Sequence, residues 1–185
     1  VAVIGCGPIG LLLVRLARLA GASTVVAVDP LPHRLDAARR YGADHCLPPA
    51  GGAGTTQPGG IAGAGLSRLV GSGVDVVFEV AGTDAAVDAA LHAARPGGRV
   101  VLVGIPDEDR TTFTASVARR KGLTIALSRR MNDVYPRAIR LVERGLVDLS
   151  SLVTGSYPLD QTAAAFTAAA ARTGLKIVVT PRSEA

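Results

Sequence analysis

The sequence has few cysteines, few aromatic residues and no long hydrophobic run. Its 185 residues include two cysteines, Cys6 and Cys46, which is too few for a disulfide framework. Arg15 and Arg18 interrupt the most apolar segment before it reaches the roughly 20 residues of a membrane helix. The first residues also lack the charged start of a signal peptide. We therefore expect a cytoplasmic protein without a membrane segment.

The net charge of +5 would suit a polyanionic partner, but the rest of the composition does not. Basic residues cluster only at short stretches such as 119–121, and aromatic residues make up 3% of the chain. A surface on which nucleic-acid bases stack needs more aromatic side chains than that. Hydrophobic residues, at 48%, indicate a globular protein. We expect no nucleic-acid partner.

Apolar segments of strand length alternate with helical patterns along most of the chain. The expected strands are 1–4, 24–28, 45–47, 74–80, 99–103 and 123–127. The expected helices are 9–20, with Arg15 and Arg18 facing outward, and 32–41, 84–94 and 115–120. Six strands joined by helical crossovers predict an α/β fold with a doubly wound six-stranded parallel sheet, the Rossmann fold.

The sequence predicts two parts of unequal size. Residues 1–131 are expected to form a dinucleotide-binding domain, and 132–185 a second segment with a helix, a strand at 152–154, a helix at 161–172 and a strand at 175–180. That segment exceeds what the sheet needs and is too short for a domain of its own. Within the first part, 48–65 (PPAGGAGTTQPGGIAGAG) is expected to be a turn-rich, mobile loop, followed by a short helix at 66–70.

A glycine-rich loop, Gly5-Cys6-Gly7-Pro8-Ile9-Gly10, lies between the first expected strand and the first expected helix. In a strand–loop–helix unit, Gly5 permits the tight turn, Gly7 the close approach of a diphosphate, and Gly10 the packing of helix on strand. Pro8 fits the first helical turn, where its missing N–H is no loss. The loop therefore predicts a dinucleotide bound at the helix N-terminus. The alternative is a glycine turn that serves packing only.

Asp29 ends the second expected strand, 24 residues after Gly5. An acid at this place binds the hydroxyls of the adenosine ribose and repels a 2′-phosphate, which favours NAD over NADP. Arg34 weakens the preference, because a nearby arginine can accommodate that phosphate. Two structural readings stay open. Asp29 could cap the helix after Pro30, and Arg34 could lie on a solvated helix face.

Two more strand ends are expected to line the cofactor site, because ligands bind at the carboxyl ends of such strands. Val80-Ala81-Gly82 ends the fourth strand, and Val103-Gly104-Ile105 ends the fifth. Gly82 and Gly104 would let a ribose or a nicotinamide ring pass close to the backbone. The alternative is that both are ordinary turn glycines.

The chain resembles the medium-chain, zinc-dependent alcohol dehydrogenase-like family in VAVIGCGPIGLLLVRLARLAGA, VVAVD, GVDVVFEVAG and RPGGRVVLVGIP. The later stretch SRRMNDVYPRAIRLVERGLVDLSSLVTGSYPLDQTAAAF resembles its polyol (sorbitol-type) dehydrogenase branch. Two features depart from the family pattern. Gly155 stands where a histidine usually follows LVT, and the loop at 48–65 replaces what is often a helix.

The resemblance implies a catalytic domain that precedes the cofactor domain and carries the zinc ligands, and to which the chain finally returns. A chain that begins with Val1 rather than methionine is then expected to be a fragment, with 132–185 as the return segment. The resemblance assigns NAD binding to Gly7, Pro8, Ile9, Asp29, Arg34, Val103, Gly104 and Ile105, and a place near nicotinamide and substrate to Ser128, Arg129 and Arg130. Arg129 would be the best substrate-facing candidate. From the residues alone, Arg129 and Arg130 follow a strand end, which fits a position in the cleft and fits a solvated basic pair equally well.

The candidate metal ligands are scattered. Cys6, Cys46, His33, His45 and His92 show no spacing typical of a zinc site, and His92 is expected on a helix surface. Glu79 is the one strand-end carboxylate near the expected site, and a satisfied structural acid explains it equally well. We therefore predict no metal site and no catalytic residue in this chain. Zinc would be bound by the preceding domain.

The resulting hypothesis is the NAD-binding portion of an alcohol or polyol dehydrogenase, inactive as an isolated fragment. It would act on an alcohol or ketone by hydride transfer to or from the cofactor. Two alternatives remain: a zinc-free quinone or enoyl reductase, and a non-catalytic module that binds NAD. The apolar strand at 123–127 would lie at the edge of the sheet, and the resemblance implies that it forms a homo-oligomer there.

Overall fold

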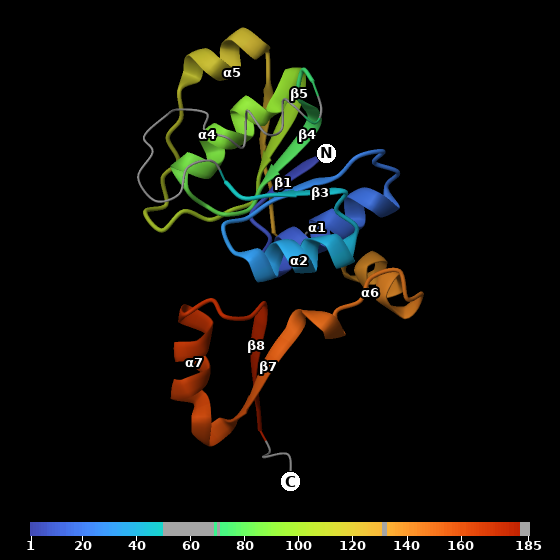
Figure 1. Ribbon diagram of the computed structural model, residues 1–185, viewed down its shortest axis with the longest axis vertical. Coiled ribbons are helices and arrows are strands. Elements are labelled where there is room, and N and C mark those ends of the chain that lie inside the picture. The colour runs from blue at the N-terminus through green and yellow to red at the C-terminus, as the bar shows by residue number, and fades with distance from the viewer. Residues whose placement is uncertain (50–68, 70, 131–132, 182–185) are drawn as a thin grey trace. The chain divides into compact units, whose positions relative to one another are not determined.

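The computed structural model describes residues 1–49, 69, 71–130 and 133–181 (Figure 1). The chain divides into two compact units, Val1–Asn132 and Asp133–Ala185, and each is described by itself. The predicted loop at 48–65 and the predicted helix at 66–70 lie almost entirely outside the described residues.

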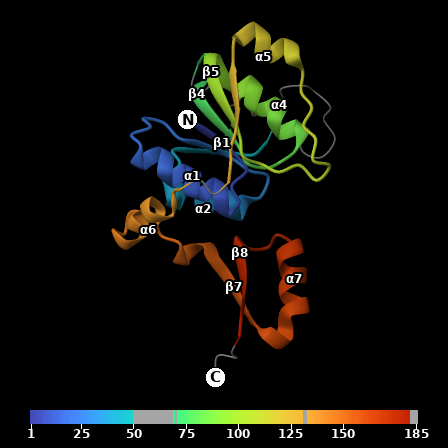
Figure 2. The same cartoon turned by 180° about the vertical axis from the view of Figure 1, so that it is seen from behind.

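The first unit is a parallel sheet flanked by helices (Figures 1 and 2). Its six strands have the order β3-β2-β1-β4-β5-β6, which confirms the predicted doubly wound fold. Because the order reverses between β1 and β4, that point is where such folds bind their ligands. The elements are β1 (Ala2–Ile4), α1 (Pro8–Leu19), β2 (Val26–Val28), α2 (Pro32–Tyr41), β3 (His45–Leu47), β4 (Val74–Glu79), α4 (Asp84–Ala93), β5 (Ala94–Leu102), α5 (Ala115–Lys121) and β6 (Thr124–Leu127).

The central strands are apolar because both faces of the sheet are covered. Every residue of β1 and β2 is buried. Ala90 and Leu91 of α4 belong to one core cluster with Ile4, Val28 and Val100. The buried stripe of α1 carries Leu11, Val14 and Ala17 at helical spacing.

Arg18 does not face outward as predicted. Its guanidinium donates from Nε to the carbonyl of Gly42 at 2.7 Å and from Nη1 to that of Ala22 at 2.9 Å. It also pairs with Asp44, whose second oxygen accepts the N–H of Val25 at 2.7 Å. The N–H of Val25 and the nearby arginine lower the pKa of Asp44. A long side chain can reach polar groups beside its helix, which the helical period alone does not reveal.

The fifth strand begins five residues earlier than predicted. Pro96, Gly97 and Gly98 lie within β5, and its register against β4 is irregular between Val74 and Val76. Between the pairs Val74–Ala94 and Val76–Arg99, β5 has three more residues than β4, so the turn-forming residues lie within the strand rather than before it. Because β5 starts at Ala94, α4 ends at Ala93. His92 is half-buried rather than a surface residue, with Nδ1 at 2.9 Å from the carbonyl oxygen of Asp88.

The second unit contains α6 (Tyr135–Glu143), a 3-10 turn at Ser150–Leu152, β7 (Val153–Pro158), a 3-10 turn at Leu159–Gln161, α7 (Thr162–Ala170) and β8 (Lys176–Thr180). Strands β7 and β8 are parallel, and α7 connects them (Figure 1). The strand predicted at 152–154 corresponds to β7, which begins one residue later, after the 3-10 turn, and extends to Pro158. At Gly155, where the family pattern has histidine, an added Cβ would lie 2.8 Å from Cδ1 of Ile177 on β8, the end of a side chain that can shift.

Candidate functional site

The carboxyl edge of the sheet brings together four segments that the sequence analysis selected. The glycine loop follows β1, Asp29 follows β2, Val80–Gly82 follows β4 and Val103–Ile105 follows β5. Since β1 and β4 are neighbours in the sheet, the loop and the β4 turn meet at the reversal of strand order. A Cβ built at Gly5 would touch the backbone of Ala81, and one built at Gly82 would touch that of Ile105, so the loop and the two turns are contiguous.

Packing explains two of the three loop glycines. Gly5 has a φ of +98°, and a Cβ there would lie 2.9 Å from the backbone nitrogen of Ala81. A Cβ at Gly10 would overlap the carbonyl oxygen of Gly5. At Gly7, an added Cβ would meet only Nη1 of Arg34, at 3.9 Å, within the described part of the chain. The fold thus requires glycine at 5 and 10 but leaves space beside Gly7, as close approach of a diphosphate demands.

The N-terminus of α1 is suited to an anion. Gly7 is its N-cap and provides no side-chain capping bond, Pro8 occupies the first turn, and no acidic residue lies in that turn. The partial positive charge of the helix start is therefore not neutralised by a side chain of the first turn. Together with the open side of Gly7, this end of α1 fits the diphosphate of a dinucleotide.

Asp29 is buried and already has two backbone partners. Its Oδ2 accepts the N–H of Cys6 at 2.8 Å, and its Oδ1 accepts the N–H of Leu31 at 2.9 Å. The second bond is a local turn contact with Leu31, the N-cap of α2, and α2 itself has no side-chain capping bond, so Asp29 does not cap the helix as the alternative reading expected. The first ties the glycine loop to the end of β2, a role that the sequence did not reveal. A carboxylate oxygen can accept more than one hydrogen bond, so ribose binding remains compatible with both contacts.

Arg34 lies beside Asp29 rather than on a solvated helix face. Its Nη1 is 3.9 Å from Oδ2 of Asp29, and its side chain is 18% exposed. Its Nε is buried and has no hydrogen-bond partner among the described residues. An unpaired guanidinium N–H at this edge fits a ligand group that accepts a hydrogen bond, such as a ribose or a phosphate oxygen.

Cys6 is a core residue despite its place in the loop. Burial, and to a smaller extent the Asp29 carboxylate, raise the pKa of its thiol to about 12. Its Sγ lies 3.6 Å from the carbonyl oxygen of Val28. A thiol held in its protonated form is a poor metal ligand. Within the described ranges, no three His, Cys, Asp or Glu side chains gather where they could hold a metal ion.

The turns after β4 and β5 are packed backbone against backbone. Gly82 has a φ of +73°, and a Cβ there would lie 2.6 Å from the carbonyl oxygen of Ile105. A Cβ at Gly104 would overlap the backbone of Gly82. Packing therefore explains both glycines without a ligand. Beside them, the Glu79 carboxylate accepts the N–H groups of Ala81 and Gly82, which makes Glu79 a satisfied structural acid.

The remaining predicted residues lie on the surface of the first unit. Ser128 follows β6 and donates its N–H to the carbonyl of Leu102 at 2.9 Å, which places it next to the end of β5. Arg129 and Arg130 are exposed. The side chains of Ile9 and Ile105 are 57% and 77% exposed, so the candidate edge presents apolar surface as well as backbone N–H groups. Apolar contacts of this kind suit the rings of a dinucleotide.

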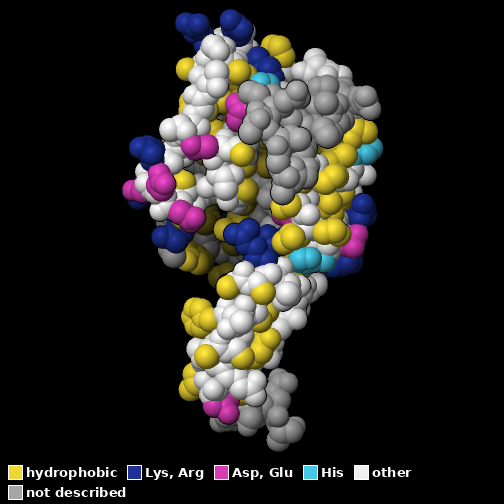
Figure 3. Space-filling view, turned by 60° about the vertical axis from the view of Figure 1, so that its left-hand side comes forward, with side chains coloured by type: hydrophobic (Ala, Val, Ile, Leu, Met, Phe, Trp, Pro, Cys, Tyr) yellow, Lys and Arg dark blue, Asp and Glu magenta, His cyan; other side chains and the backbone are white. Residues whose placement is uncertain are grey.

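Two further observations concern the distribution of surface charge and the hydropathy of the helices. On the face in Figure 3, the Lys and Arg side chains lie in small separate groups, with acidic side chains between some of them. In the part of the chain that the structure describes, no helix has the length and apolar character needed to cross a bilayer.

Comparison with known proteins identifies the relatives of this chain. The zinc-binding dehydrogenase family model matches residues 8–144. Sorbitol dehydrogenase of Bacillus subtilis is 32% identical over 163 residues, which cover 88% of this chain and 44% of that protein. The crystal structure of 2R,3R-butanediol dehydrogenase from Bacillus subtilis is 30% identical, has a TM-score of 0.82, and is matched over 98% of this chain and 50% of its own.

A further solved structure bears on the cofactor. A zinc-binding dehydrogenase of Sinorhizobium meliloti, crystallised with NADP, is 29% identical with a TM-score of 0.80, matched over 97% of this chain and 52% of its own. The chain spans about half the length of the curated relatives it matches, between 43% and 49% for the first of them.

Proposed function

The chain belongs to the zinc-binding dehydrogenase family, and on that premise we propose that it is the NAD-binding portion of an alcohol or polyol dehydrogenase. The observation that carries the proposal is the geometry around Gly7. There, a helix start without a side-chain cap and an open glycine lie beside a buried strand-end aspartate. The cytoplasmic location expected from the sequence is part of this proposal.

Each half of the site has a role in holding the dinucleotide. The loop Gly5–Gly10 would hold the diphosphate, with Pro8 and Ile9 at the helix start, and Asp29 the adenosine ribose. On the other side, Val80, Ala81, Gly82, Val103, Gly104 and Ile105 would flank the nicotinamide half, near Ser128, Arg129 and Arg130. NAD, when bound, accepts or supplies the hydride of the reaction. The chain's own residues bind and orient it.

The preference for NAD over NADP rests on charge. The Asp29 carboxylate, buried at the end of β2, would repel a 2′-phosphate. Arg34, 3.9 Å away, partly offsets that repulsion. Since a relative was crystallised with NADP, the preference is a matter of degree that direct titration will measure.

The names of two relatives suggest a substrate with adjacent hydroxyl groups. Sorbitol and 2R,3R-butanediol are both alcohols of this kind. We propose that Arg129 and Arg130, exposed after β6, face the substrate. Zinc would be held by the part of the protein that corresponds to the unmatched half of the relatives, and it would polarise the reacting oxygen there.

The small core of the second unit is consistent with the proposal that it packs on a catalytic domain encoded before this chain. In its described part, only Val147, Leu152 and Ala165 are buried apolar residues. Its sheet has two parallel strands, although parallel strands are normally covered on both faces and extended by further strands. Leu159 and Phe166 are 63% and 71% exposed. We propose that 132–185 is a return segment that completes a catalytic domain.

The edge strand β6 is proposed as the site of homo-oligomerisation. Leu127 on that strand is 83% exposed, and β6 pairs only with β5 among the described strands. An open edge with apolar side chains favours pairing with a second copy. Leu127→Lys should then shift the protein toward a smaller species in analytical ultracentrifugation. An unchanged sedimentation coefficient would contradict this assembly.

The test of the function uses the protein as its gene encodes it. We expect NADH to bind more tightly than NADPH in a fluorescence titration, stoichiometric zinc by elemental analysis, and NAD-dependent oxidation of polyols. Failure to bind either nucleotide would overturn the proposal. Binding without zinc or dehydrogenase activity would favour a non-catalytic module, and zinc-free reduction of quinones or enoyl compounds would favour a reductase.

A further inference from the structure

Glu79 is a buried acid for which the proposed function provides no role. It is the last residue of β4 and is 1% exposed. In the sheet it lies between Ile4 of β1 and Leu102 of β5, directly at the reversal of strand order. Burial raises the pKa of its carboxyl, although the N–H groups of Gly82, Ala81 and Gly104 lower it. Burying a carboxylate at such a place costs free energy unless hydrogen bonds to the carboxylate compensate for it.

Glu79 binds both turns that follow its own strand and the next one. Its Oε1 accepts the N–H groups of Ala81 and Gly82, each at 2.7 Å. Its backbone oxygen accepts the N–H groups of Val103 and Gly104 at 2.8 and 3.0 Å. One residue thus fixes the turn after β4 through its side chain and the turn after β5 through its main chain.

The two turns have little freedom to move independently. A Cβ at Gly82 would lie 2.6 Å from the carbonyl oxygen of Ile105, and a Cβ at Gly104 would lie 2.7 Å from Oε2 of Glu79. The backbones and this carboxylate are therefore in direct contact, without intervening side chains. Because close-packed groups transmit displacement, a change in the carboxylate alters the position of both turns.

We propose that Glu79 is a positioning residue for the nicotinamide half of the cofactor, setting the separation of the turns Val80–Gly82 and Val103–Ile105. In a doubly wound sheet each set of three strands binds one mononucleotide. Asp29 on β2 belongs to the adenosine half, so the turns after β4 and β5 belong to the nicotinamide half. The inference rests on the proposed function and extends it to a residue that does not itself touch the cofactor.

The test compares two ligands on the protein as its gene encodes it. NADH contains both halves of the cofactor, whereas ADP contains adenosine and the diphosphate but neither nicotinamide nor its ribose. Glu79→Gln keeps the size of the side chain, and its amide oxygen can still accept the N–H groups of Ala81 and Gly82. Its amide nitrogen replaces Oε2 and opposes the N–H of Gly104, which hydrogen-bonds the carboxylate in the wild type. We expect its affinity for NADH to fall about tenfold and its affinity for ADP to change less than about twofold.

Asp75→Asn is the matched control. Asp75 lies on the same strand at its other end, is 72% exposed and pairs with Arg95 at 2.7 Å, so the variant removes the same charge away from the turns. We expect wild-type affinity for both ligands. If Glu79→Gln does not fold, Glu79→Asp, which keeps the carboxylate on a shorter side chain, should show a smaller loss confined to NADH.

Three outcomes would overturn the inference. Equal losses for NADH and ADP would show that Glu79 supports the whole unit and has no particular role for one half. Unchanged affinity for NADH would show that the turns keep their positions without the carboxylate. If the wild-type protein binds ADP but not NADH, the proposed cofactor is wrong and this inference falls with it, whereas the first two outcomes leave the proposed function intact.

Discussion

The carboxylate of Asp29 accepts the backbone N–H of Cys6 at 2.8 Å, although the two residues are 23 positions apart. This bond joins the end of β2 to the middle of the glycine loop. The residue proposed to select the adenosine ribose therefore also holds the loop proposed to bind the diphosphate. In the proposed site, one buried side chain would therefore couple cofactor selection to loop geometry.

Asp29→Asn tests this coupling. The amide can accept from Cys6 or from Leu31 but presents a donor to the other, so we expect the free energy of unfolding to fall by about 1–3 kcal/mol. NADH binding should weaken, and the ratio of NADH to NADPH affinity should move toward NADPH because the repelling charge is gone. Denaturant unfolding and fluorescence titration measure the two effects.

The control for that variant is Asp36→Asn. Asp36 lies on α2 with its side chain 60% exposed and paired with Arg39, so the same charge is removed from a solvated position. Stability should change by less than about 0.5 kcal/mol, and the cofactor ratio should not change. An unaltered ratio in Asp29→Asn itself would show that Asp29 does not select the cofactor.

Gly7→Ala and Gly10→Ala separate binding from folding. At Gly10 a methyl group would overlap the Gly5 carbonyl, so we expect a loss of stability of about 3 kcal/mol or more. At Gly7 the nearest described atom is 3.9 Å away and φ is −67°, so stability should stay within about 0.5 kcal/mol. Affinity of Gly7→Ala for NADH should nevertheless fall about tenfold or more. Wild-type affinity in that variant would remove the argument for a diphosphate at Gly7.

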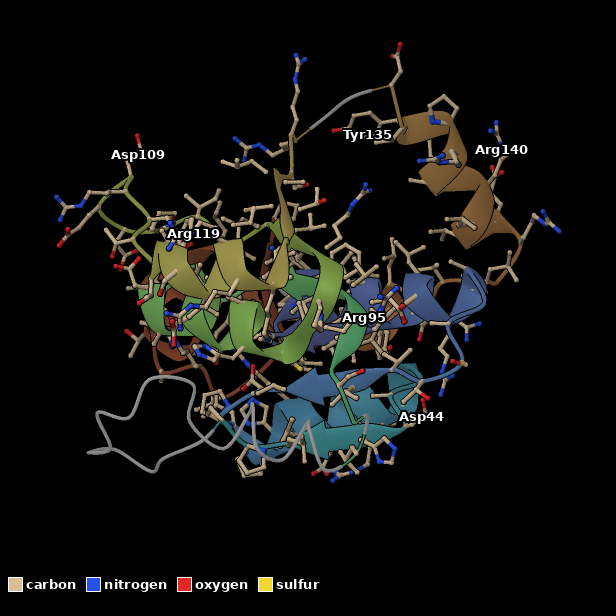
Figure 4. All side chains as sticks on the ribbon, turned by 90° about the horizontal axis from the view of Figure 1, so that it is seen from above. Asp44, Arg95, Asp109, Arg119, Tyr135 and Arg140 are labelled. Carbon is tan, nitrogen blue, oxygen red and sulfur yellow. The ribbon has the colours of Figure 1, made fainter. Side chains whose placement is uncertain are left out.

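Lys121 secures the C-terminal end of α4. Its Nζ donates to the carbonyl oxygens of Leu91, His92 and Ala94 at 3.0, 2.7 and 2.8 Å. Lys121→Met keeps the aliphatic chain but leaves these carbonyls without the cation, so we expect about 1–2 kcal/mol of destabilisation. Arg119→Met, two residues earlier on the exposed side of α5, should be neutral (Figure 4). Equal unfolding midpoints of the two variants in urea would contradict this role.

Glu79 makes a pH-dependent contribution to stability. Burial raises the pKa of its carboxyl above the ordinary 4.5, so the folded protein holds this proton more tightly than the unfolded chain does. The contribution is then fully present below the unfolded pKa and is lost as pH rises through the folded pKa.

Because glutamine does not titrate, comparing the wild type with Glu79→Gln measures how the Glu79 carboxyl alone changes stability with pH. The unfolding free energy of the wild type minus that of the variant should decrease as pH rises from about 4.5 toward neutrality. Denaturant titrations of both proteins at a series of pH values give this difference, in which the other titrating groups cancel. A difference that stays constant or grows with pH would show that burial does not control this carboxyl.

The sequence by itself determined the sheet and the segments that line its carboxyl edge. Buried parallel strands require continuous apolar runs, helices require a period near 3.6, and a strand–glycine loop–helix unit has few other uses. These local patterns predicted α2 with its observed bounds, the doubly wound parallel sheet, and the glycine loop with Asp29 at the end of the second strand. They failed where Pro96–Gly98 continue β5 through a register shift, because a register shift depends on the partner strand.

The tertiary structure alone decided which side chains act on groups far away in sequence. Arg18 reaches Gly42 and Asp44, and Asp29 reaches Cys6, because strands and helices from different parts of the chain lie side by side. It also divided the glycines into those that packing requires and Gly7, which packing does not. A sequence records residue type and spacing, whereas the distance between two backbones, and the room left for a ligand, exist only once the chain has folded.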